Sequence, residues 1–124
     1  MSLRDICKRC GGLTVIGEKG SEVDIKKVIL ESPYAGNIKR NTEYAKLCLK
    51  DSLTRSESPI CSHLLFPQVL DDKIPGEREQ GINAGLAWIK SADYHIFYID
   101  YGWSPGMKAA YDNSRCKKIF RKIL

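Results

Sequence analysis

Residues 28–37 read VILESPYAGN, an apolar run that passes into a turn containing proline and glycine. This pattern predicts a buried strand, and Asn37 is a typical N-cap for a helix that begins directly after it. Residues 94–107, YHIFYIDYGWSPGM, repeat the order of strand, Gly-containing turn and helix start. In an open α/β sheet, ligands bind beyond the carboxyl ends of the strands, where such turns lie. We therefore expect a ligand site at these two turns.

Strand-like and helix-like segments alternate from residue 26 to the end of the chain. The expected strands are 27–31, 58–65, 94–100 and 118–124, and the expected helices are 37–53, 77–91 and 105–115. Alternation of this kind predicts right-handed crossovers and a parallel sheet. We expect an α/β, flavodoxin-like three-layer sandwich whose short, mostly parallel four-stranded sheet has the order 2-1-3-4. Residues 26–124 would form this domain, and residues 1–25 a Gly/Cys-rich extension, either a hairpin or an oligomer contact.

The composition is that of an ordinary globular domain. The chain has 124 residues, of which 43% are hydrophobic and 28% charged, which excludes an intrinsically disordered protein. No apolar run approaches the roughly 20 residues of a membrane span. Charged residues near the start also interrupt any signal peptide. We expect a cytoplasmic protein that has no membrane partner.

The formal net charge of +5 is modest, and its basic residues concentrate at 8–9 and 115–122. Nucleic-acid binders usually present a basic stripe with interleaved aromatic residues. The terminal cluster instead suits a helix end and an edge strand, which lysine and arginine protect from pairing with other chains. The pattern argues against a nucleic-acid partner and is equally compatible with a smaller anionic ligand.

The five cysteines cannot all pair within one chain. Cys7 and Cys10 form a C-x-x-C motif, but a structural zinc ion needs four ligands and no second such motif or His pair follows. Cys48 and Cys61 lie in apolar contexts, typical of buried thiols. We expect reduced cysteines, with no metal and no cofactor.

The carboxyl ends of the predicted strands gather residues suited to binding a sugar and its base. These candidates are Glu31, Ser32, Tyr34, Gly36, Asn37, His63, Gln68, Asp100, Trp103, Ser104, Gly106 and Met107. Aromatic faces stack on bases, and carboxylates accept hydrogen bonds from hydroxyl groups. A carboxylate near an anomeric carbon can also act as a nucleophile or stabilise an oxocarbenium ion. Simpler roles remain open: Glu31 and Asp100 also suit helix caps or solvent contact, and His63 suits a hydrogen-bonded, partly buried site.

Four motifs together resemble the nucleoside 2-deoxyribosyltransferase-like superfamily, and more closely its small, mostly uncharacterised bacterial and phage members. They are SPYAGN at 32–37, HLLFPQ with LDD at 63–72, EREQGI at 77–82 and YGWSPGMK at 101–108. The resemblance spans residues 27–124. It implies a flavodoxin-like fold with a nucleoside or nucleotide pocket over the first and third strands.

In the transferases, a glutamate in the helix after the third strand attacks the anomeric carbon, assisted by a tyrosine and an aspartate. The resemblance matches Tyr34 and Gly36 to the first-loop motif, Asp100 to the acidic strand end, and Gly106 and Met107 to the helix-opening motif. The nucleophile of members with an acid four residues after that glycine falls at position 110.

Position 110 of this chain is Ala110. The nearest acid, Asp112, would lie about 160° away around the helix. The candidate catalytic residues are therefore Asp112, Glu31 and Asp100.

Three functions remain open. The leading hypothesis is a nucleoside- or nucleotide-binding domain that acts on an N-glycosidic bond. The second is a non-catalytic nucleotide binder that sequesters or senses its ligand, which Ala110 and the positive charge favour. The third is an oligomeric interaction module. We expect a homo-oligomer and expect Tyr34 and Asp100 to border one shared hollow.

Overall fold

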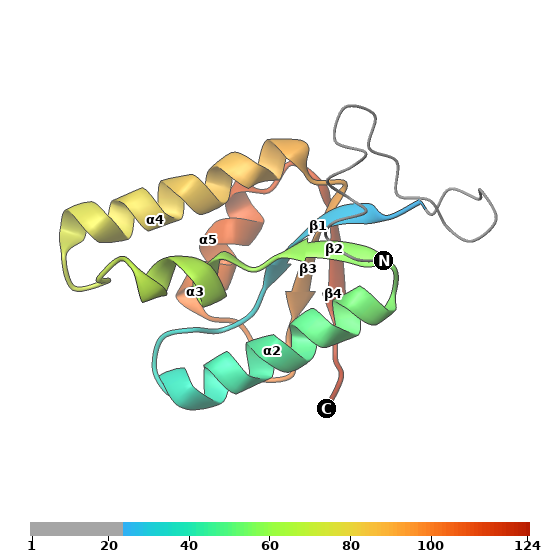
Figure 1. Ribbon diagram of the computed structural model, residues 1–124, viewed down its shortest axis with the longest axis horizontal. Coiled ribbons are helices and arrows are strands. Elements are labelled where there is room, and N and C mark those ends of the chain that lie inside the picture. Colours follow the sequence, from blue (N-terminus) through green and yellow to red (C-terminus); the bar gives the residue numbers. More distant parts are fainter. Residues whose placement is uncertain (1–23) are drawn as a thin grey trace, which may run out of the picture.

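The computed structural model describes residues 24–124, so the expected extension and its C-x-x-C motif fall outside the described residues, except for 24 and 25. Four parallel strands form one sheet in the order β2-β1-β3-β4 (Figure 1). The strands are β1 (Lys26–Glu31), β2 (Glu57–Ile60), β3 (Tyr94–Tyr98) and β4 (Lys117–Arg121). The predicted α/β fold and strand order are confirmed.

The helices follow the strands in the expected alternation. They are α2 (Ile38–Thr54), α3 (Ser62–Leu65), α4 (Pro75–Ala87) and α5 (Pro105–Asn113), with 3₁₀ turns η3 (Phe66–Gln68) and η4 (Trp88–Ser91). The Asn37 side chain caps α2 by accepting a hydrogen bond from the Arg40 amide at 3.1 Å. Ser104 caps α5 in the same way, accepting from the Met107 amide at 3.1 Å. Both predicted helix starts depend on these side chains.

The second strand is shorter than predicted. β2 ends at Ile60, and the residues from 62 onward turn into α3, where the Leu64 amide donates to the Cys61 carbonyl at 3.0 Å. Pro59 lies in this strand at the edge of the sheet, where a missing amide hydrogen is tolerated. The strand prediction over 61–65 is wrong because a short apolar run does not distinguish a strand from a helical turn.

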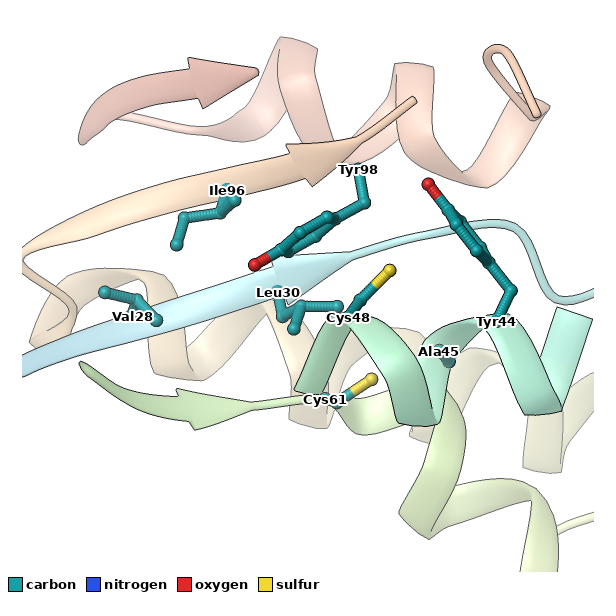
Figure 2. Packing of buried hydrophobic residues seen from close by; sticks show 8 residues of the cluster. All are labelled: Val28, Leu30, Tyr44, Ala45, Cys48, Cys61, Ile96 and Tyr98. Carbon is teal, nitrogen blue, oxygen red and sulfur yellow. The ribbon is translucent and has the colours of Figure 1, made fainter. Parts of the chain in front are cut away.

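The main core lies between the sheet and α2 (Figure 2). Its buried residues are Val28, Leu30, Tyr44, Ala45, Cys48, Cys61, Ile96 and Tyr98. On the opposite face, a smaller buried cluster joins Phe97 of β3 to Met107 and Ala110 of α5. Since side chains alternate along a strand, β1 and β3 each supply both faces. The helices α4 and α5 lie together on the face opposite α2, which gives three layers (Figure 1).

Helix α4 lies against its neighbours without burying any of its own residues. A Cβ atom at Gly85 would be 3.3 Å from Ser62 Oγ, and one at Gly81 would be 3.4 Å from Leu70 Cδ1. The two glycines, four residues apart on one side of the helix, therefore allow a close approach to the segment after β2. This contact supports α4 at its flank and leaves open space beneath it.

Three observations apply to residues 24–124 only. No helix in this range is long and apolar enough to cross a membrane. Cys48, Cys61 and Cys116 are free thiols there, and the range contains no cluster of three potential metal ligands.

Candidate functional site

A hollow of about 360 Å³ lies at the carboxyl end of β1, bounded by the segment after β2, by α4 and by the start of α5. A second hollow of about 260 Å³ adjoins it between α4 and α5. Glu31 lines both hollows, and so do residues of α4 and α5 such as Arg78 and Gly106. We treat them as two lobes of one site. It occupies the position that the strand order predicts for a ligand.

Glu31 is the acidic residue that reaches both lobes. Its Oε1 atom is 3.2 Å from Nε2 of His95, whose side chain is fully buried in β3. Among the described residues, Oε2 of Glu31 has no hydrogen-bond partner. The side chain is 18% exposed and lines the hollow. One oxygen is thus held by the protein and the other is available to a ligand.

A second polar group lies next to Glu31. Ser32 Oγ is 2.6 Å from Nε2 of His63, and Cys61 Sγ is 3.3 Å from the same nitrogen. Burial lowers the pKa of His63 below its usual value, although the charge of Glu31 opposes this shift. Burial also raises the pKa of the Cys61 thiol. Both groups are therefore neutral at neutral pH, and the thiol lacks the thiolate character of a nucleophile.

The remaining walls are mostly apolar. Phe66, Leu70 and Ile82 line one side, and Met107 lines the other. Tyr34 borders the hollow from the loop after β1. The Tyr34 carbonyl accepts a hydrogen bond from the buried Asn41 side chain at 3.0 Å, which fixes this loop. An apolar cavity with a few converging polar groups is the usual form of a small-molecule site.

Charged residues also line the hollow. Arg78 on α4 contributes the positive charge, while Asp72 and Glu77 contribute negative charges. Glu77 Oε1 also accepts a hydrogen bond from the Asp71 amide at 3.1 Å, which ties the start of α4 to the preceding loop.

Comparison with protein families places this fold and site in context. One family model matches residues 26–123, and its description is "Domain of unknown function (DUF7768)". The chain belongs to this family. The match includes every residue that lines the two lobes. No match was found among curated proteins or among solved structures.

The structure brings together about half of the candidate site residues. Those that line the hollow are Glu31, Ser32, Tyr34, His63, Ser104, Gly106 and Met107. Those that do not are Gly36, Asn37, Gln68, Asp100, Trp103 and Asp112. Gly36 instead supplies the turn, with a φ of +96° that favours glycine, and Gln68 donates to the Leu64 carbonyl at 2.7 Å.

Asp100 has a structural position that corrects the expectation of a hollow shared with Tyr34. Its carboxylate accepts a hydrogen bond from the Tyr44 hydroxyl at 2.5 Å and from the Leu124 amide at 2.8 Å, with the Ile123 amide also within 3.0 Å. Burial opposes ionisation, but these hydrogen bonds prevail and lower the pKa of Asp100. Asp100 therefore fastens the carboxyl end of the chain to β3 and α2.

Two further candidates on or near α5 point elsewhere. Trp103 packs against Phe97, with ring centroids 5.2 Å apart, in an aromatic cluster outside the hollow. Asp112 is exposed on α5, whereas Ala110, two residues earlier, lines the second lobe. The helical rotation between these two positions explains the difference. Asp112 therefore does not line either lobe of the hollow, and its catalytic role stays a prediction that the position of its side chain does not favour.

The sequence analysis missed the contribution of α4. Arg78, Gly81 and Ile82 line both lobes, yet none was a candidate. The helix has little amphipathic pattern in its sequence, and it buries no residue in the structure. The four-residue spacing of Gly81 and Gly85 was the signal that could have revealed its close contact with the segment after β2.

Proposed function

We propose that the hollow binds a nucleoside or nucleotide and that Glu31 acts on its N-glycosidic bond. The observation that carries the proposal is the Glu31 side chain, which lines a mostly apolar cavity and has one carboxylate oxygen held by buried His95. The position of the hollow after β1 and beside the start of α5 agrees with the resemblance to the nucleoside 2-deoxyribosyltransferase-like superfamily.

The residues around Glu31 suit the parts of such a ligand. Tyr34 and Phe66 offer aromatic faces for a base. Ser32 and His63 offer a hydroxyl group and a neutral imidazole for hydrogen bonds to the sugar. Arg78 supplies a positive charge for a phosphate group, if the ligand is a nucleotide.

The proposed reaction needs only water besides the ligand. The free oxygen of Glu31 forms a bond to the anomeric carbon while the carbon–nitrogen bond breaks. The electron pair of that bond leaves with the base, which takes up a proton from water. Water then hydrolyses the glycosyl ester, which releases the sugar and restores the carboxylate.

Non-catalytic binding is the second candidate, and Ala110 is the observation that favours it. This residue faces the second lobe at the position where the resemblance implies a nucleophilic glutamate. A methyl group there cannot attack a sugar. If Glu31 does not replace that nucleophile, the same hollow would retain a nucleotide without cleaving it.

Product analysis with matched variants tests the proposal. The protein is incubated with nucleosides, deoxynucleosides and their 5′-monophosphates, free base is measured by chromatography, and a sugar adduct is sought by intact mass spectrometry. We expect base release by the wild-type protein and by Asp112→Asn, whose carboxylate lies outside the hollow. Glu31→Gln keeps the shape and an acceptor for His95, so we expect binding without release.

The outcomes separate the two candidates. Ligand binding without base release by any of these proteins would support the sequestering or sensing function. Absence of binding to every compound would contradict both. Equal release by wild type and Glu31→Gln would exclude Glu31 as the reacting group.

A further inference from the structure

Three aromatic side chains outside the hollow form an exposed cluster, here called the aromatic platform. Trp103 precedes α5, Tyr111 lies on α5 and Phe120 lies on β4; they are 38%, 41% and 48% exposed. Their ring centroids lie 5.6 to 6.1 Å apart, and all three contact the buried ring of Phe97. Large apolar residues grouped in this way usually mark an interaction surface.

Positive charge accompanies the platform. Lys118 Nζ lies 5.0 Å from the centroid of the Tyr111 ring. Lys118 and Phe120 are two residues apart in β4, so their side chains lie on the same face of the sheet. Ile119 between them points to the other face, where it packs on the α2 core. Exposed Lys108 precedes Tyr111 by three residues on α5, which places both on one side of the helix.

We propose that the aromatic platform binds single-stranded nucleic acid, with bases stacked on the exposed rings and phosphates near the lysines. Every base has a π-face, so stacking on aromatic side chains combined with a basic surface binds single strands with little sequence preference. Paired bases within a duplex do not offer those faces.

Charge argues against a second copy of this chain as the occupant. Antiparallel pairing of β4 with its own copy, centred on Ile119, would place Lys117 opposite Arg121 of the other chain, which is an unfavourable pair of like charges. A polyanion instead complements them. The charge pattern of the sequence argued against this partner, because Trp103, Tyr111 and Phe120 come from three segments that only the fold brings together.

Fluorescence titrations test the proposal directly. The probes are 5′-labelled 15-nucleotide strands of thymidylate and of uridylate at low salt, with a labelled DNA duplex as the control. Trp88→Phe leaves Trp103 as the single tryptophan of the chain. We expect a saturable increase in the fluorescence anisotropy of the labelled single strands and weaker binding to the duplex. Binding of the single strands should also quench the Trp103 emission. The DNA and RNA arms show which sugar is preferred.

Matched variants locate the surface. We expect Phe120→Ala to weaken binding about five-fold or more, which is the lower range for loss of one base–aromatic stack. Tyr101→Ala removes an equally exposed aromatic residue that lies against Tyr44 outside the platform, and should leave binding unchanged. Lys118→Gln should reduce the slope of log K against log salt by about 0.7, the value for one phosphate contact of a single strand. Lys46→Gln on α2 is its control.

Four results would overturn the proposal. They are no saturable binding at low salt, an unchanged Trp103 emission, equal losses in Phe120→Ala and Tyr101→Ala, and a wild-type dimer that Phe120→Ala converts to a monomer in sedimentation experiments. Circular dichroism confirms that each variant folds. If Phe120→Ala does not fold, Lys118→Gln and the Trp103 emission decide, because neither measurement depends on that variant.

Discussion

The two faces of the sheet are built differently. Towards α2, polar groups are buried and paired: Glu57 accepts hydrogen bonds from Arg121, Tyr94 and Ser52 at 2.6 to 2.8 Å. The Tyr98 hydroxyl donates to Asp51 on α2 at 2.8 Å. Since Glu57 lies on β2 and Arg121 on β4, their ion pair joins the two edge strands of the sheet.

The face towards α4 and α5 lacks this closure. Helix α4 buries none of its residues, Nδ1 of fully buried His95 has no partner among the described residues, and Glu31 has only one of its oxygens paired. Buried polar atoms are normally satisfied, and exceptions often mark functional sites. The face towards α2 therefore stabilises the fold, which allows the other face to keep a hollow and a partly paired carboxylate.

The largest expected effect of a substitution is at the ion pair of the closed face. Arg121→Met leaves the buried Glu57 carboxylate without its charged partner, and we expect the free energy of unfolding to fall by about 3–5 kcal/mol. Arg55→Met removes the exposed partner of Asp51 and should cost about 1 kcal/mol or less. Urea unfolding measures both. Similar losses in the two variants would contradict the proposed role of the buried pair.

Truncation of an apolar side chain should cost more stability on the α2 face than on the face that carries the hollow. Leu30 is fully buried towards α2, so Leu30→Ala should cost about 2–5 kcal/mol. Ile82 of α4 is half exposed and lines the hollow, so Ile82→Ala should cost less than about 1 kcal/mol. The same denaturation experiment tests the pair, and a large loss at Ile82 would show that α4 is packed more tightly than described.

Acid should destabilise the closed face through Glu57. Burial opposes its ionisation, but hydrogen bonds from Arg121, Tyr94 and Ser52 outweigh burial and lower its pKa from 4.5 to about 2. The ionised carboxylate therefore stabilises the fold above pH 4.5, and this contribution is lost as the pH falls from 4.5 towards 2. The loss amounts to about 3 kcal/mol.

The control for this pH dependence is Glu57→Gln, which cannot ionise at that position. Its unfolding free energy should fall less steeply between pH 5 and pH 2 than that of the wild type. Asp100, whose pKa is also lowered, contributes equally in both proteins. Parallel curves would exclude Glu57 as the source.

The smallest expected loss of stability follows removal of a tyrosine hydroxyl, and it separates Tyr44 of α2 from Tyr34 of the loop after β1. Tyr44→Phe removes the hydroxyl that donates to Asp100 and accepts from its amide, so we expect a loss of about 1–3 kcal/mol. Tyr34 faces the hollow, and Tyr34→Phe should change stability by no more than about 0.5 kcal/mol. Thermal unfolding compares them. A greater loss of stability in Tyr34→Phe than in Tyr44→Phe would contradict the structural role given to the Tyr44 hydroxyl.

The sequence predicted the parts of the molecule that depend on local pattern. The apolar runs at 28–30 and 94–98 predicted the two central strands, and Asn37 marked the start of the helix that follows the first of them. Glu31 and Ser32 line the hollow at the carboxyl end of β1, which is the edge of the sheet where a parallel order places ligands.

The positions of Asp100 and Trp103 depend on contacts with residues far away in the sequence, which local pattern could not predict. Asp100 stands at a strand end like Glu31, but its hydrogen bonds reach Tyr44, 56 residues earlier, and Leu124, 24 residues later. No spacing rule connects these positions. Trp103 likewise lies outside the hollow, where it packs against Phe120 of β4 with ring centroids 5.6 Å apart.

The central claim is that the hollow beside Glu31 receives a nucleoside or nucleotide. An NMR titration of isotopically labelled protein with nucleosides and their 5′-monophosphates tests it residue by residue. We predict saturable shift changes at Ser32, Tyr34 and Gly106, with little change at Leu124. No saturable change at millimolar ligand, or changes at Leu124 while the residues of the hollow stay silent, would contradict the claim.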